Sequence, residues 1–123
     1  MSSLNTGDFL LRPKLLGFSH VGVWLGGGAV FHNAPGKGEH ISSLAEFAEG
    51  EGVTIEPSLA DPAIVLSRVR EKLQAPRDYD LITNNCEHSA TGVVTGRSYS
   101  RQIVASMLVL FGLGALYLSL RRR

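Results

Sequence analysis

Residues 19–33, SHVGVWLGGGAVFHN, contain two short apolar runs on either side of three consecutive glycines. Apolar, largely β-branched and aromatic residues dominate both runs, and this composition is typical of strands. Glycine readily adopts the positive φ angles that tight hairpin turns require. The stretch therefore predicts a β-hairpin with arms at Ser19–Leu25 and Ala29–Asn33 and its turn at Gly26–Gly28.

Two histidines, His20 and His32, lie on opposite arms of this hairpin. A three-residue loop pairs Leu25 with Ala29 and sets Gly22 opposite His32. Both histidines then share one face as diagonal neighbours, with backbones roughly 7–8 Å apart. A two-residue loop would put them on opposite faces, because successive strand residues alternate. A catalytic pair of histidines therefore requires the first register or an equivalent bulge.

Further elements are expected on both sides of the hairpin. Apolar runs, capping residues and prolines indicate where each one begins and ends. The expected elements are a short apolar stretch at Phe9–Leu11, a strand at Val53–Glu56, a short helix after the capping box Ser43–Glu46, a helix from Asp61 to about Gln74, and a helix from Asn84 or Asn85 to Gly96. The pattern predicts an α+β fold, with a small antiparallel sheet packed against helices.

The sole cysteine, Cys86, lies in TNNCEH at residues 83–88. Asparagine is a strong N-cap residue, so Cys86 is expected in the first turn of its helix. There the helix dipole favours the thiolate, and unpaired N–H groups could stabilise an oxyanion. A nucleophilic cysteine also needs a base, and the hairpin offers His20 and His32. These three residues are the candidate catalytic site.

The other polar residues near this motif have plainer interpretations. His40 follows a Gly-rich stretch and is expected in a solvated loop. His88 lies about 200° around the helix from Cys86, so it is expected to point away and form packing or hydrogen-bond contacts. Glu87 compensates the helix dipole. The histidines lack the spacing of metal ligands, so neither a metal nor another cofactor is predicted.

The C-terminal stretch Ile103–Leu120 holds 18 residues without a charge. As a helix it would be about 27 Å long, close to the thickness of a bilayer core. Arg101 precedes it and Arg121–Arg123 follow, so residues 101–123 carry +4 while residues 1–100 carry −3. We predict a membrane-anchor helix in 101–123 with an Arg-rich end that suits anionic headgroups, the alternative being a buried core helix.

The charge distribution and the N-terminus bear on partners and location. The formal net charge is +1 and the basic residues do not form a nucleic-acid footprint, so no nucleic-acid partner is predicted. The N-terminus shows no secretory signal, and one cysteine excludes an internal disulfide framework. Residues 1–100 are therefore expected to form a catalytic domain on the cytoplasmic side of a membrane, held by residues 103–120. No oligomeric state is predicted.

Several motifs, in order along roughly residues 7–102, resemble the lecithin:retinol acyltransferase-like family, the permuted branch of the NlpC/P60 thiol hydrolases. The matching elements are Gly7-Asp8, Ser19–Trp24, Val30–Pro35, Tyr79–Leu81 and Asn85–His88. This resemblance implies a papain-like core in which Cys86 is the nucleophile, His20 the general base and His32 the polar residue that orients His20. Ser89 stands where the family's motif usually carries an aromatic residue.

Both lines of reasoning predict a membrane-anchored thiol acyltransferase or phospholipase A-like enzyme. Cys86 would take an acyl group from a phospholipid or other acyl-lipid ester as a thioester, then pass it to water, an amine or an alcohol. Two alternatives remain open. One is a cysteine peptidase or amidase, the chemistry of the wider superfamily, and the other is a non-catalytic interaction domain tethered to a membrane.

Overall fold

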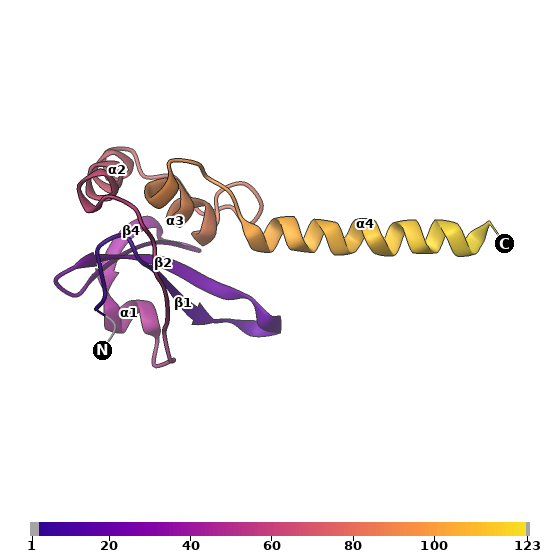
Figure 1. Ribbon diagram of the computed structural model, residues 1–123, viewed down its shortest axis with the longest axis horizontal. Helices are drawn as coiled ribbons and strands as arrows, with labels where there is room; N and C mark the ends of the chain where they lie inside the picture. The colour runs from indigo at the N-terminus through magenta and orange to yellow at the C-terminus, as the bar shows by residue number, and fades with distance from the viewer. Residues whose placement is uncertain (1–2, 123) are drawn as a thin grey trace.

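The computed structural model describes residues 3–122; residues 1 and 2, and Arg123 of the Arg-rich end, lie outside the described residues. Five antiparallel strands form one sheet in the order β4-β3-β2-β1-β5 (Figure 1). The strands are β1 (Phe9–Pro13), β2 (Ser19–Gly26), β3 (Ala29–Ala34), β4 (Gly38–Ser43) and β5 (Thr54–Glu56). The helices are the 3-10 turn η1 (Leu15–Gly17), α1 (Leu44–Ala48), α2 (Pro62–Gln74), α3 (Cys86–Thr95) and α4 (Arg101–Arg121). The predicted α+β class with a C-terminal apolar helix is confirmed.

Two apolar clusters hold the sheet between its helices. The larger cluster packs Val21, Val23 and Phe31 of the sheet against Val65 and Val69 of α2 and against α3. The smaller cluster joins Leu10, Val30 and Phe47, the last from α1. Since strand side chains alternate between faces, β3 supplies buried residues to both clusters, and β2 adds the partly buried Trp24 to the smaller one. Ile64 of α2, although apolar and next to the buried Val65, is 47% exposed.

The β2–β3 hairpin has the predicted histidine register but a different turn. Gly22 pairs with His32, as predicted. Gly26, not Leu25, pairs with Ala29, and the register shifts between Trp24 and Gly26. The expected three-residue loop is therefore wrong, and the structure realises the alternative of a two-residue turn with a bulge. The extra residue in the bulge restores the even register, so both histidines remain on one face.

Strand β4 corrects the expectation of a loop around His40. It pairs with β3 along its whole length, and His40 lies directly opposite His32. The sequence does not predict this strand, because its polar residues are the buried ones. Glu39 and Ser42 are buried, whereas the apolar Ile41 is 46% exposed. Gly38 permits the sharp entry into β4 with φ 71°, where a Cβ would lie 3.0 Å from the Arg77 carbonyl oxygen.

Local capping fixes the ends of the other helices as predicted. The Ser43 side chain accepts a hydrogen bond from the Glu46 N–H at the start of α1. Asp61 does the same for Ala63 at the start of α2, where Pro62 occupies the first turn. Such caps satisfy N–H groups that the helix itself leaves free, so short sequence signals are enough to locate them.

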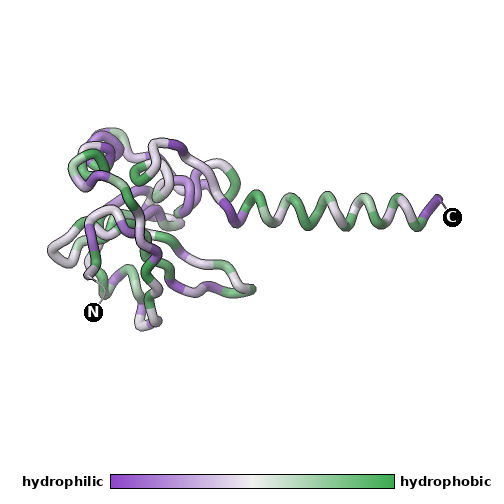
Figure 2. Tube along the Cα trace, viewed as in Figure 1, coloured by the Kyte–Doolittle hydropathy of each residue, from purple (hydrophilic) through white to green (hydrophobic). Residues whose placement is uncertain are grey.

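Helix α4 projects away from the globular body, and its apolar residues run along its whole length (Figures 1 and 2). It is long and apolar enough to cross a membrane, and none of that apolar stretch is buried against the rest of the chain. The alternative of a buried core helix is therefore wrong. Exposed apolar surface of this extent indicates that another apolar phase or partner covers the helix.

Candidate active site

The two hairpin histidines meet in a buried contact. Nε2 of His20 lies 2.9 Å from Nδ1 of His32, with the rings edge to face, and their residues are 3% and 6% exposed. The Phe47 ring stacks on His20 and meets the edge of His32. Gly22 leaves room for this packing, since a Cβ there would lie 2.7 Å from both Phe47 and Val30. The predicted proximity of His20 and His32 is therefore realised.

Ser42 determines which ring nitrogens carry protons. Its hydroxyl donates to the Ser43 carbonyl oxygen at 3.0 Å, which leaves its oxygen as an acceptor for Nε2–H of His32 at 2.8 Å. His32 then has a lone pair on Nδ1, so it accepts from Nε2–H of His20. Nδ1 of His20 is left as the basic nitrogen. Ser42, His32 and His20 thus form a hydrogen-bonded relay that presents a proton acceptor.

Burial keeps both histidines neutral near neutral pH. Burial and, after it, the adjacent His32 together lower the pKa of His20 to about 3. Burial lowers the pKa of His32 to about 4, with His40 as the largest neighbouring charge effect. A neutral imidazole can accept a proton, so His20 is in the protonation state that a general base requires.

His40 is a third histidine of this cluster that the sequence did not place there. Its ring centroid lies 4.2 Å from that of His32, and its Nδ1–H donates to the Gly38 carbonyl oxygen at 2.8 Å. One feature of the sequence could have placed it. His40 follows His32 across a short turn at a spacing that puts the two residues opposite each other in a hairpin.

Cys86 begins α3, as predicted, and its sulfur lies beside the backbone of β2. Sγ is 3.9 Å from the Ser19 carbonyl oxygen, and the Val21 N–H acts to lower the pKa of the thiol, so backbone groups on either side of His20 face the sulfur. Paired residues of β2 and β3 begin at Gly22, so Sγ occupies the part of β2 that β3 leaves open. Within residues 3–122, no hydrogen bond joins Sγ to the His20 ring. The Cys86 sulfur thus lies beside the backbone of β2 that carries His20, without a direct bond to the histidine pair.

The electrostatics of Cys86 differ from the expectation of a thiolate at rest. Cys86 is 2% exposed, and this burial raises the pKa of its thiol despite the hydrogen bond from Val21. Asn85 also uses two N–H groups of the helix start, because its side chain accepts from Glu87 and His88. In the described chain the Cys86 N–H has no hydrogen-bond partner, so it is the free donor at this terminus.

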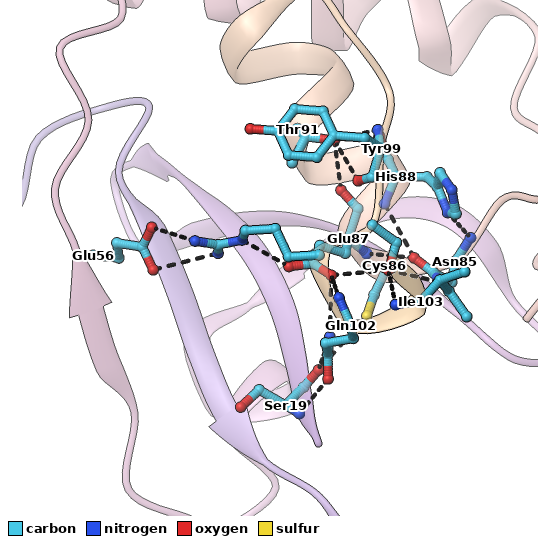
Figure 3. Close-up of polar contacts among 12 residues, drawn as sticks. Ser19, Glu56, Asn85, Cys86, Glu87, His88, Thr91, Tyr99, Gln102 and Ile103 are labelled. Carbon is cyan, nitrogen blue, oxygen red and sulfur yellow. Dashed lines mark hydrogen bonds and ion pairs between the residues drawn. The ribbon is translucent and has the colours of Figure 1, made fainter. Parts of the chain in front are cut away.

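Glu87 has a larger role than dipole compensation. It is 2% exposed, and its carboxylate accepts from the Ser100 hydroxyl, the Arg101 guanidinium and the Gln102 backbone N–H (Figure 3). The Gln102 side chain in turn makes two hydrogen bonds to the Ser19 backbone. These contacts favour the charged carboxylate and hold the pKa of Glu87 below its usual value. The residue after Cys86 thereby ties the start of α4 to α3 and β2.

His88 has the predicted supporting role. Its Nδ1 accepts from the Asn85 N–H at 3.2 Å and completes a capping box with the Asn85 side chain. Figure 3 shows its ring pointing in a different direction from the Cys86 sulfur. His88 therefore stabilises the helix start that carries Cys86.

Ser89 stands where the sequence motifs led us to expect an aromatic side chain, and polar contacts hold it instead. It is fully buried, accepts from the Asn33 side chain and donates to the Glu39 carboxylate. Lys72 of α2 lies 3.3 Å from that carboxylate. This polar network fastens α3 to β3 and β4, away from the cavity beside Cys86.

A cavity of about 620 Å³ opens at Cys86, and its lining is largely apolar. The β1–β2 loop forms one wall with Leu15, Leu16 and Phe18, the loop before α3 contributes Tyr79 and Leu81, and α4 contributes Ile103 and Ser106. Burial raises the pKa of the Tyr79 hydroxyl, and the nearby Cys86 raises it to a smaller extent. An apolar chain with a polar reactive end fits such a cavity.

No group of three or more His, Cys, Asp or Glu side chains within residues 3–122 is arranged to hold a metal ion.

Comparison with known proteins identifies the family. Curated proteins give no significant match to the sequence. The profile described as lecithin retinol acyltransferase matches residues 2–99, about four-fifths of the chain. The resemblance seen in the sequence motifs is thereby confirmed, and the chain belongs to the lecithin retinol acyltransferase family.

Proposed function

We propose that this protein is a membrane-anchored, cysteine-dependent acyltransferase with phospholipase A-like activity. Membership of the family indicates acyl chemistry on lipids. The observation that carries the finer proposal is the relay from Ser42 through His32 to His20, next to a helix-capped Cys86 that lines an apolar cavity.

In the acylation step, Nδ1 of His20 takes the Sγ proton while the sulfur attacks the carbonyl carbon of a lipid ester. This step requires the Cys86 side chain to turn from the Ser19 carbonyl oxygen, 3.9 Å from Sγ, toward Nδ1 of His20. The free Cys86 N–H donates to the tetrahedral oxyanion. The C–O bond to the alcohol then breaks, His20 returns its proton to the departing oxygen, and an acyl thioester remains on Cys86.

The thioester is resolved by a second nucleophile. Water, an amine or an alcohol loses a proton to His20 and attacks the thioester carbonyl, and the Cys86 thiolate leaves and regains the proton. The neutral resting state fits this scheme, because burial disfavours both a standing thiolate and an imidazolium ion. His32 orients His20 through the hydrogen bond between their rings and is itself fixed by Ser42.

We further propose that residues 1–100 form the catalytic domain and residues 101–123 its membrane anchor, with the domain on the cytoplasmic face. Helix α4 has the length and composition of a span, and Glu87 fixes its start close to Cys86. Such a connection would hold the cavity at the level of the phospholipid esters. It would raise their effective concentration at the sulfur without further contacts.

Acyl trapping tests the proposal. The full chain in vesicles of phosphatidylcholine carrying a labelled acyl group should acquire label on Cys86 through a hydroxylamine-sensitive bond. Cys86→Ala and His20→Ala should abolish the label, whereas His88→Gln, which preserves the capping box, should retain it. Peptide cleavage without acylation would instead support a peptidase, and neither activity would support an interaction domain.

A further inference from the structure

The loop between β1 and β2 presents two leucines to solvent. Leu15 and Leu16 are 87% and 93% exposed, far more than large apolar side chains usually are in a folded domain. Leu16 also has a φ of 61°, a left-handed conformation that is costly for a residue with a bulky side chain. The loop is nevertheless well closed, since the Lys14 N–H donates to the Phe18 carbonyl oxygen at 2.7 Å. The fold thus holds two leucines outward in an ordered turn.

This loop lies along the first turns of α4. Leu16, Gly17 and Phe18 share a groove with α4 residues as far along as Val109 and Leu110. The two hydrogen bonds from the Gln102 side chain to Ser19 fix the end of the loop to the helix start. Figures 1 and 2 show the apolar loop between β1 and β2 and helix α4 leaving the body on the same side.

The position along α4 gives the depth of the loop. The uncharged stretch begins at Ile103 and the groove reaches Val109, six residues further, which is about 9 Å along a helix. If α4 spans a bilayer, a loop beside Val109 lies below the headgroups at the edge of the acyl chains. Exposed Lys14 at the base of the loop is then level with the phosphates.

We propose that the loop Leu15–Phe18, with Leu81 on the opposite wall of the cavity, inserts into the phospholipid leaflet beside α4. The cavity at Cys86 then opens sideways into the acyl-chain layer, and a lipid reaches the sulfur without leaving the membrane. Leu15, Leu16 and Leu81 all line that cavity together with Ile103 of α4. This inference rests on the membrane anchor of the proposed function, and it adds a second contact with the same leaflet.

Depth labelling of the full chain in phosphatidylcholine vesicles tests the inference. In a Cys86→Ser background, Leu16→Cys, Leu110→Cys and Leu59→Cys each provide one thiol for an environment-sensitive fluorophore. Leu59 is a matched control, because it is fully exposed and lies just before α2. Nitroxides placed near the top of the acyl chains should cause loss of most of the emission from labels at positions 16 and 110, with no loss at position 59.

Each other result is decisive in a different way. Quenching at position 110 with none at position 16 overturns the inserted loop and leaves the membrane anchor standing. Absence of quenching at both positions overturns the anchor and the inference with it. Shielding at position 16 that disappears when the protein is diluted into excess lipid indicates that a second copy covers the loop, and it also overturns the inference.

Discussion

Replacing Ser42 by alanine should weaken catalysis although Ser42 touches neither the sulfur nor the substrate cavity. The hydroxyl accepts from His32 Nε2–H at 2.8 Å, and that bond determines which nitrogen of His20 is basic. Without it, Nε2–H of His32 has no acceptor, and the reverse direction of the relay becomes favoured. His20 can then carry its proton on Nδ1, the tautomer that cannot accept the proton of Cys86.

The expected size of this effect follows from the hydrogen bond that is lost. His32 is 6% exposed, so its Nε2–H has little access to water once the hydroxyl is removed. Leaving such a donor unsatisfied costs about 1–3 kcal/mol, whereas the competing tautomer pays no such penalty. We therefore expect kcat/KM for acyl release to fall roughly 5- to 150-fold in Ser42→Ala.

Two measurements separate this positioning effect from general destabilisation. In ¹⁵N spectra of wild-type protein, His20 and His32 should both be protonated at Nε2, and Ser42→Ala should shift the protonation of both rings toward Nδ1. Ser43→Ala is the matched control: it removes the cap of α1, costing about 1 kcal/mol of stability, but keeps the carbonyl that orients Ser42. Unchanged tautomers and wild-type kcat/KM in Ser42→Ala would refute the relay.

Three further predictions concern protonation and packing. The folded-state pKa values of His20 and His32 lie near 3 and 4, below the unfolded value of 6.5, so the unfolded chain protonates first. The free energy of unfolding should therefore be greatest above about pH 6.5 and fall toward pH 4. Thermal unfolding in detergent should show this slope, with a flatter one in His20→Gln/His32→Gln; a flat wild-type profile contradicts it. Alkylation of Cys86 should still accelerate at pH 9, because burial raises the pKa of the thiol; an inflection below pH 7 would show a resting thiolate. Gly22→Ala should cost about 1–3 kcal/mol by forcing Phe47 off the histidines, while Gly52→Ala, with open space around it, should be nearly neutral in the same denaturation assay.

The structure also explains why some sequence interpretations were incomplete. The loop expected around His40 is strand β4, whose buried positions are polar because Glu39 and Ser42 serve networks on β3 and α3. Glu87 was interpreted from its place at a helix start alone. Its main partners lie 13 to 15 residues away, beyond any local pattern. Long-range polar partners of this kind leave no periodic signature.

Local signals in the sequence were enough for the hairpin, the Asn85 cap that starts α3 at Cys86, and the apolar helix that ends the chain. Each depends on residues a few positions apart, since turns, caps and apolar length are short-range properties. Tertiary structure alone decided the bulge before Gly26, the Ser42 relay and the raised pKa of Cys86. These depend on which distant strands and helices bury the groups, because desolvation and hydrogen-bond direction are set by neighbours in space.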